Sequence, residues 1–150
     1  MNQKGDEPLR TKGQIEAEIS EAIIKFEKEY MGRGPAETKT YIIDDLVLVR
    51  LKGIMTQAEY QLARTDDTPT GRELIKQVRH ELLEKGRPLL EAVMHDLTGR
   101  KTVSLHTDIS TTVGERVIIF TLDAPVEFAP QIGPPIRGDI AREGIDLGTQ

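Results

Sequence analysis

Hydrophobic and polar residues alternate between residues 101 and 122, as they do in β-strands that bury one face. One parity holds Val103, Leu105, Thr107 and Ile109, and the other holds Ser104, His106, Asp108 and Ser110. Gly114 suits a tight reversal, and the run after it is rich in Val, Ile and Phe. The pattern predicts a β-hairpin with an apolar buried face and a second face that carries His106 and Asp108.

A second hairpin is predicted over residues 40–52, where Asp44 and Asp45 separate two apolar runs. The second run, residues 46–51, is apolar on both parities until Arg50. A strand of this kind is central in its sheet or covered on both sides. A guanidinium at Arg50 needs a partner, and we expect a structural ion pair.

Three helices are predicted from apolar residues that recur at spacings of three and four. The first follows a capping box at Thr11 and ends at Gly32, and the second is short and starts with a capping box at Thr56. The third covers residues 70–98, and Pro88 predicts a kink or a break inside it. Its expected buried stripe is Leu74, Val78, Leu82, Leu89, Val93 and Leu97, widened by Ile75, Leu83 and Leu90.

Placed in chain order, these elements give the arrangement α-ββ-α-α-ββ. We predict an α+β fold, a two-layer sandwich in which two hairpins form a four-stranded, mainly antiparallel sheet with helices on one face. The predicted domain covers residues 11–123. A disordered N-terminus over 1–10 and a flexible C-terminal tail over 124–150, rich in Pro and Gly, complete the chain.

Composition narrows the possible functions. A net charge of −5 and an aromatic content of 4% disfavour nucleic-acid binding. The absence of cysteine excludes disulfides, thiolate metal sites and cysteine nucleophiles, and it is compatible with a reducing cytoplasm, where we expect the protein to be. No apolar run is long enough to cross a bilayer, and residues 1–10 do not resemble a signal peptide.

His106 and Asp108 are weak candidates for catalysis. Two residues apart on one strand, they lie about 7 Å apart, close enough for the carboxylate to influence the imidazole. A flat strand does not supply the strained turn and oxyanion donors that a nucleophilic Ser104 or Ser110 would need. We therefore expect a solvated face or a dimer interface, with a ligand site as the alternative.

The segment after the first helix offers a second candidate site. Arg33 and Gly34 present a guanidinium and backbone N–H groups that suit an anion, although a simple helix stop with a solvated Arg33 is the commoner arrangement. We predict ligand-binding residues at Arg33, Gly34, Arg50, His106, Asp108 and Ser110. The motif around His80 lacks the second histidine of a zinc-protease helix, so neither a metal nor a cofactor is predicted.

Several motifs follow one another in a distinctive order: FEKEYMGRGP (26–35), VRLKG (49–53), GRE (71–73), RP (87–88), HTDIS (106–110), GER (114–116) and Phe120. Together they resemble the MpsC family, which is labelled a component of a sodium-translocating, membrane-potential-generating system. The resemblance covers residues 11–123. It implies a small bacterial protein that is associated with a membrane transport system, and it carries no established catalytic residue.

Taken together, these features favour a non-catalytic accessory or regulatory protein that is associated with a membrane-bound ion or inorganic-carbon transport system. Its expected partner is another protein, and a homodimer is a candidate assembly. The alternatives are a small-ligand module that binds an anion and an enzyme that uses His106 and Asp108.

Overall fold

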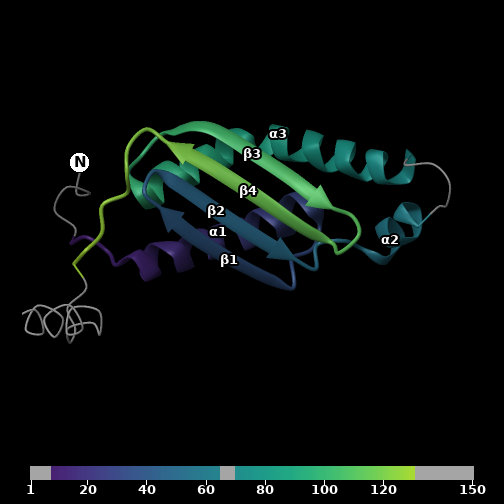
Figure 1. Ribbon diagram of the computed structural model, residues 1–150, viewed down its shortest axis with the longest axis horizontal. Coiled ribbons are helices and arrows are strands. Elements are labelled where there is room, and N and C mark those ends of the chain that lie inside the picture. The colour runs from purple at the N-terminus through teal and green to yellow at the C-terminus, as the bar shows by residue number, and fades with distance from the viewer. Residues whose placement is uncertain (1–7, 65–69, 131–150) are drawn as a thin grey trace, which may run out of the picture.

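The computed structural model describes residues 8–64 and 70–130. Its helices and strands are α1 (Lys12–Met31), β1 (Glu37–Ile43), β2 (Leu46–Lys52), α2 (Gln57–Ala63), α3 (Thr70–Thr98), β3 (Thr102–Ser110) and β4 (Glu115–Leu122). Figure 1 shows one sheet with α1 and α3 packed as a layer on one side of it. The predicted α+β fold, with two hairpins and helices on one face, is confirmed.

The sheet has the strand order β1-β2-β4-β3, and every neighbouring pair is antiparallel. The predicted central position of β2 is confirmed, because it pairs with β1 on one side and with β4 on the other. Asp44 takes the left-handed backbone that the two-residue turn demands, with φ of 53°. Gly114 has φ of 69°, and a Cβ there would lie 2.2 Å from the Tyr60 hydroxyl, so the second turn requires glycine.

The core lies between the sheet and the helix layer. On α1, apolar residues at spacings of three and four are buried: Ile15, Ile19, Ile23 and Phe26. The inward positions of β2 and β4 meet this stripe and are fully buried; they include Val47, Val49, Ile118 and Phe120. Removing each such side chain from water stabilises the fold by about 1.5–3 kcal/mol before entropic costs.

The break predicted in α3 is absent, and its predicted buried stripe is only partly right. The helix is continuous from Thr70 to Thr98 with Pro88 inside it, because residues on both sides of the proline pack into the core and outweigh one missing hydrogen bond. Ile75, Leu83 and Leu90 are buried as predicted, but the rest of the buried stripe lies one residue further along than expected. The members of the whole stripe are Gly71, Ile75, Arg79, Leu83, Gly86, Leu90 and Met94.

The rotation of α3 is set by its contact with α1. Gly86 lies against the ring of Phe26, where a Cβ would come within 2.2 Å of an aromatic carbon. This close approach turns Leu74 and Val78 to the outside, where they are 48% and 50% exposed. An arginine, Arg79, therefore occupies a core position that the sequence pattern assigned to an aliphatic residue.

One position of β3 also differs from the prediction. Val103 is 66% exposed, because the register shifts between Thr102 and Ser104 and leaves the residue between them outside the ladder. Beyond this bulge the predicted alternation holds: Ile109 is buried and His106 is exposed.

The first residues of the predicted tail lie on the domain. Val126 is buried, Phe128 packs against the core, and the N–H of Ala129 donates to the Arg10 carbonyl at 2.9 Å. Arg10 itself was predicted to be disordered, yet its guanidinium donates to the Leu97 carbonyl at 3.0 Å. The remainder of both predicted terminal segments, residues 1–7 and 131–150, is outside the described part of the chain.

Candidate functional site: the open face of the sheet

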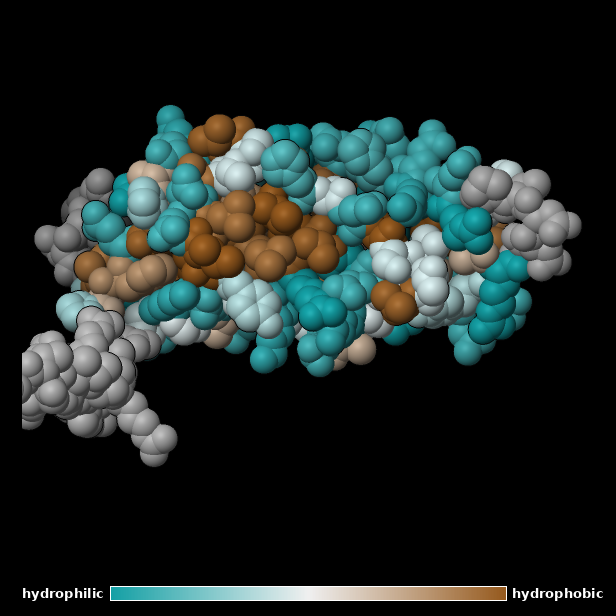
Figure 2. All heavy atoms as spheres, viewed as in Figure 1, coloured by the Kyte–Doolittle hydropathy of each residue, from teal (hydrophilic) through white to brown (hydrophobic). Residues whose placement is uncertain are grey.

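The sheet face turned away from the helices is apolar over the half that adjoins the β1–β2 turn. The strand registers align its side chains in two rows, read from β1 to β3: Ile43, Leu46, Thr121 and Ser104, then Tyr41, Leu48, Ile119 and His106. Tyr41 is 42% exposed and Ile43 is 53% exposed. Figure 2 shows a hydrophobic area over the middle of the sheet, bordered by more polar side chains. A contiguous apolar area of this kind is typical of a protein contact surface.

The other half of the open face is charged. Its two rows, in the same direction, are Lys39, Arg50, Val117 and Asp108, then Glu37, Lys52, Glu115 and Ser110. The predicted ion pair of Arg50 is present, because its guanidinium donates to the Glu115 carboxylate on the neighbouring strand. This hydrogen bond raises the pKa of Arg50 and lowers that of Glu115. These four rows of side chains together form the open face of the sheet.

The side chains of His106 and Asp108 contact different groups. The imidazole Nε2 of His106 lies 3.2 Å from the Ser104 hydroxyl, whereas Asp108 accepts a hydrogen bond at 3.3 Å from Lys76 on α3. Because β3 is an edge strand, the Asp108 carboxylate can turn around it towards the helix. The backbone N–H of Ile109 also donates to this carboxylate and is the main reason that its pKa is lowered. The imidazole that faces the Ser104 hydroxyl is therefore not oriented by the Asp108 carboxylate.

The remaining predicted ligand residues, Arg33, Gly34 and Ser110, contact groups other than His106 and Asp108. Arg33 follows α1 and donates to the Met55 carbonyl at 3.3 Å, next to Gly32, which ends the helix with φ of 84°. Gly34 lies against the aliphatic part of the Lys28 side chain. Ser110 closes β3 at the charged end of the open face. Each of these groups has its own local surroundings, so the predicted anion site at Arg33 and Gly34 does not extend to His106.

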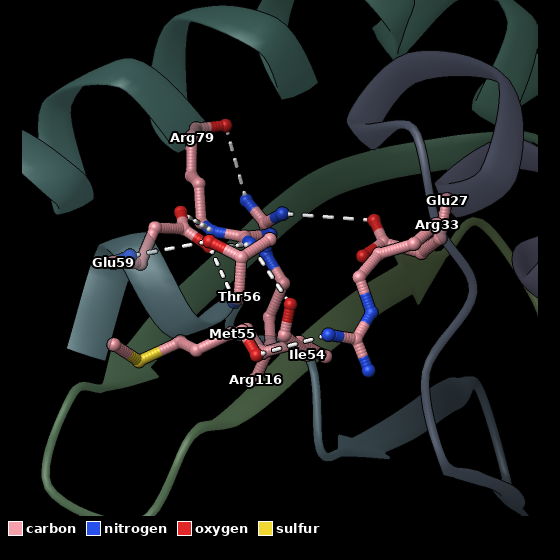
Figure 3. Close-up of polar contacts among 8 residues, drawn as sticks. All are labelled: Glu27, Arg33, Ile54, Met55, Thr56, Glu59, Arg79 and Arg116. Carbon is pink, nitrogen blue, oxygen red and sulfur yellow. Dashed lines mark hydrogen bonds and ion pairs between the residues drawn. The ribbon is translucent and has the colours of Figure 1, made fainter. Parts of the chain in front are cut away.

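The sequence analysis missed a buried ionic cluster, which is drawn in Figure 3. Arg79 of α3 donates to both carboxylate oxygens of Glu59, at 2.7 and 2.9 Å, and to the Ile54 carbonyl at 2.9 Å. Arg116 of β4 donates to the Arg79 carbonyl at 3.3 Å and lies 3.8 Å from the Glu27 carboxylate of α1. These contacts join all three helices to the sheet.

Burial dominates the electrostatics of this cluster. Glu27 and Arg116 are each 1% exposed. Desolvation raises the pKa of Glu27, opposed by the positive charge of Arg116, and it lowers the pKa of Arg116 to about 10, opposed by Glu27. The sequence did contain a signal for this cluster, because residues four apart lie on the same side of a helix. Glu27 follows the apolar Ile23 by four residues, and Arg79 follows the apolar Ile75 by four.

A small cavity opens between α3 and β3 beside this cluster. Its volume is ≈ 160 Å³, and its lining includes Lys76, His80, Thr107 and Arg116, with the Asp108 carboxylate at the same wall. Two cations, an imidazole and a hydroxyl are groups that suit an anion. Among the described residues, no group of His, Asp and Glu side chains is arranged to hold a metal ion.

Comparison with known proteins places this architecture in a family. The family model described as "Na+-translocating membrane potential-generating system (MpsC)" matches residues 11–124. The chain belongs to the MpsC family. The resemblance predicted from the ordered motifs is thereby confirmed.

Two relatives of this MpsC-family chain are uncharacterised proteins of Bacillus subtilis (strain 168). YbcI is 45% identical over 113 residues, which cover 75% of this chain and 89% of YbcI. YrhF is 30% identical over 112 residues, which cover 73% of this chain and 88% of YrhF. No solved structure matches the chain. Within residues 8–64 and 70–130, no helix has the length and apolar character needed to cross a membrane.

Proposed function

We propose that this MpsC-family chain is a non-catalytic accessory or regulatory protein that acts through protein contacts in the service of a membrane-bound ion or inorganic-carbon transport system. The observation that carries the proposal is the apolar half of the open face, where Tyr41 and Ile43 are about half exposed. Exposing such an area to water is costly unless another protein covers it. The family description supplies the membrane system, and the cysteine-free chain suits the cytoplasm.

The separation of His106 from Asp108 supports the non-catalytic part of the proposal. An enzyme built on this pair would need the carboxylate to orient the imidazole, yet Asp108 is engaged with Lys76. The exposed imidazole instead continues the second row of the open face, beside Ile119. It is therefore better placed to contact a protein surface than to transfer a proton.

The proposal is tested by capture in the native host. The tagged full chain is cross-linked in living cells, the membranes are solubilised, and captured proteins are identified by mass spectrometry. We expect a multi-spanning ion or inorganic-carbon transport protein, with recovery reduced by Tyr41→Asp on the open face. Leu89→Asp is the matched control, because Leu89 is 43% exposed on α3 and Tyr41 is 42% exposed. Capture of no transport protein by the unchanged chain refutes the proposal.

The cavity between α3 and β3 supports a second candidate function, the binding of a small anion. Lys76, His80, Arg116 and Thr107 line the cavity, and an anion would compete with Asp108 for Lys76. Titration calorimetry with inorganic phosphate on the full chain tests this function. Binding that is weakened at least tenfold by Lys76→Met, and unchanged by Lys85→Met on an exposed turn of the same helix, supports it. Absence of any heat of binding counts against it.

A further inference from the structure

The open face has a pattern that is complementary to itself. When a two-fold axis relates two copies of a chain, their sheets face each other only if that axis lies in the plane of the interface. One possible axis runs parallel to the strands, between β2 and β4. It places β1 of one copy over β3 of the other copy, and β2 over β4. Each row of side chains then lies opposite the same row of the second copy. The apolar rows then cover each other, and so do the charged rows. An axis across the strands at the middle of the face would set the first row against the fourth and place apolar side chains on charges.

From this pattern we infer that the partner of the open face is a second copy of this chain, related by the strand-parallel two-fold axis. The inference rests on the proposed function, in which the open face binds protein. It specifies contacts: Leu48 lies opposite Ile119 of the second copy, and Tyr41 lies opposite His106 of the second copy. Apolar side chains meet at the centre, and an aromatic ring meets an imidazole towards the edge.

The charged rows complete the match. Lys39 has no ion pair with any described residue, and the axis sets it opposite Asp108 of the second copy. The Asp108 side chain is 82% exposed, and pairing with Lys39 requires its carboxylate to leave Lys76 of its own chain. In the fourth row, Lys52 lies opposite Glu115 of the second copy. Opposite charges therefore meet at both positions, although each chain carries a net charge of −5. Self-complementarity of this kind is the requirement for an isologous contact.

The size of the face indicates a modest affinity. Four strands are about 20 Å across and seven residues are about 24 Å long, so the two copies together cover about 1,000 Å², the lower limit for a specific interface. We expect a dimer that dissociates on dilution. In this arrangement the dimer is the form that serves the transport system. It carries two copies of every surface outside the interface, and both copies are available to a further partner.

Sedimentation velocity of the full chain over a concentration series measures the assembly. We expect a reversible monomer–dimer equilibrium that Tyr41→Asp shifts at least tenfold towards monomer and that Leu89→Asp leaves unchanged. Circular dichroism confirms that both variants are folded. Lys39→Asp should weaken the dimer, and the addition of Asp108→Lys should restore it. A monomer at every concentration, or equal effects of Tyr41→Asp and Leu89→Asp, overturns the inference.

A second measurement tests the geometry and needs no destabilising change. Because the chain has no cysteine, Tyr41→Cys and His106→Cys each introduce a single thiol. A short bismaleimide should link the two variants when they are mixed. It should not link Tyr41→Cys to itself, because the axis puts the two Tyr41 positions at opposite edges, about 14 Å apart across the strands. Self-linking as efficient as mixed linking overturns the strand-parallel axis.

The two proposals fail in different ways. A monomeric chain that still captures a transport protein through Tyr41 overturns the dimer and leaves the proposed function standing. A dimeric chain that captures no transport protein overturns the proposed function and leaves the dimer standing.

Discussion

Replacing Arg79 by methionine should destabilise the protein strongly, although arginine is an unusual core residue. The guanidinium is 3% exposed and makes three hydrogen bonds, two to Glu59 and one to the Ile54 carbonyl. No residue of α2 is fully buried, so this ion pair is a principal attachment of α2 to α3. The substitution keeps a long aliphatic side chain and removes only the polar fork.

The expected loss follows from these contacts. An unpaired buried carbonyl at Ile54 costs about 1–3 kcal/mol. Loss of a fully buried ion-pair partner costs about 3–5 kcal/mol, but the Glu59 side chain is 23% exposed and water compensates for much of that cost. The methionine side chain returns about 1 kcal/mol of hydrophobic burial. We therefore expect Arg79→Met to lower the free energy of unfolding by about 3 kcal/mol, and the melting temperature by about 10 °C.

Urea denaturation followed by circular dichroism measures this free energy. Arg87→Met on the same helix is the control, because its side chain is 34% exposed and its pairs with Glu84 and Glu91 lie at the surface. We expect the control to lose less than about 1 kcal/mol. A loss below about 1 kcal/mol for Arg79→Met as well would show that the buried cluster does not hold α2 and α3 together.

Three further outcomes follow from the structure. Gly86→Ala should cost about 3 kcal/mol in urea denaturation, since its Cβ would lie 2.2 Å from Phe26, whereas Gly13→Ala in open space should stabilise α1 by about 0.5 kcal/mol. Burial favours a raised pKa for Glu59, but hydrogen bonds from Arg79 and Thr56 outweigh it and lower the pKa below 4.5. The folded state thus binds fewer protons, and the stability that Glu59 contributes is present above that value and lost as pH falls; Glu59→Gln should weaken the pH dependence of unfolding between about pH 5 and about pH 3. His106→Ala should change the melting temperature by less than about 2 °C, because the side chain is exposed.

Local patterns predicted most of the architecture. Alternation and turn residues gave both hairpins, and the spacing of Ile15, Ile19 and Ile23 gave the buried side of α1. They succeeded because strand and helix periods are set by neighbouring residues alone. The charged and hydroxyl side chains predicted to bind ligands were correctly placed on loops and strand faces, but their distances from one another depend on how the elements pack.

Local sequence patterns did not predict which side of α3 is buried. Its outer side carries Leu74, Val78 and Leu89, so hydrophobicity alone favours the wrong face. The contact of Gly86 with Phe26 decides between the two, and that contact joins residues far apart in the chain.

The sequence by itself determined the elements, their order and the alternation that leaves one sheet face uncovered, because these depend on near neighbours. The tertiary structure decided which charges are buried together, which side chains share a row across four strands, and that Asp108 turns to Lys76 rather than to His106. Those are relations between distant segments, and their energies arise only when packing removes water from between them.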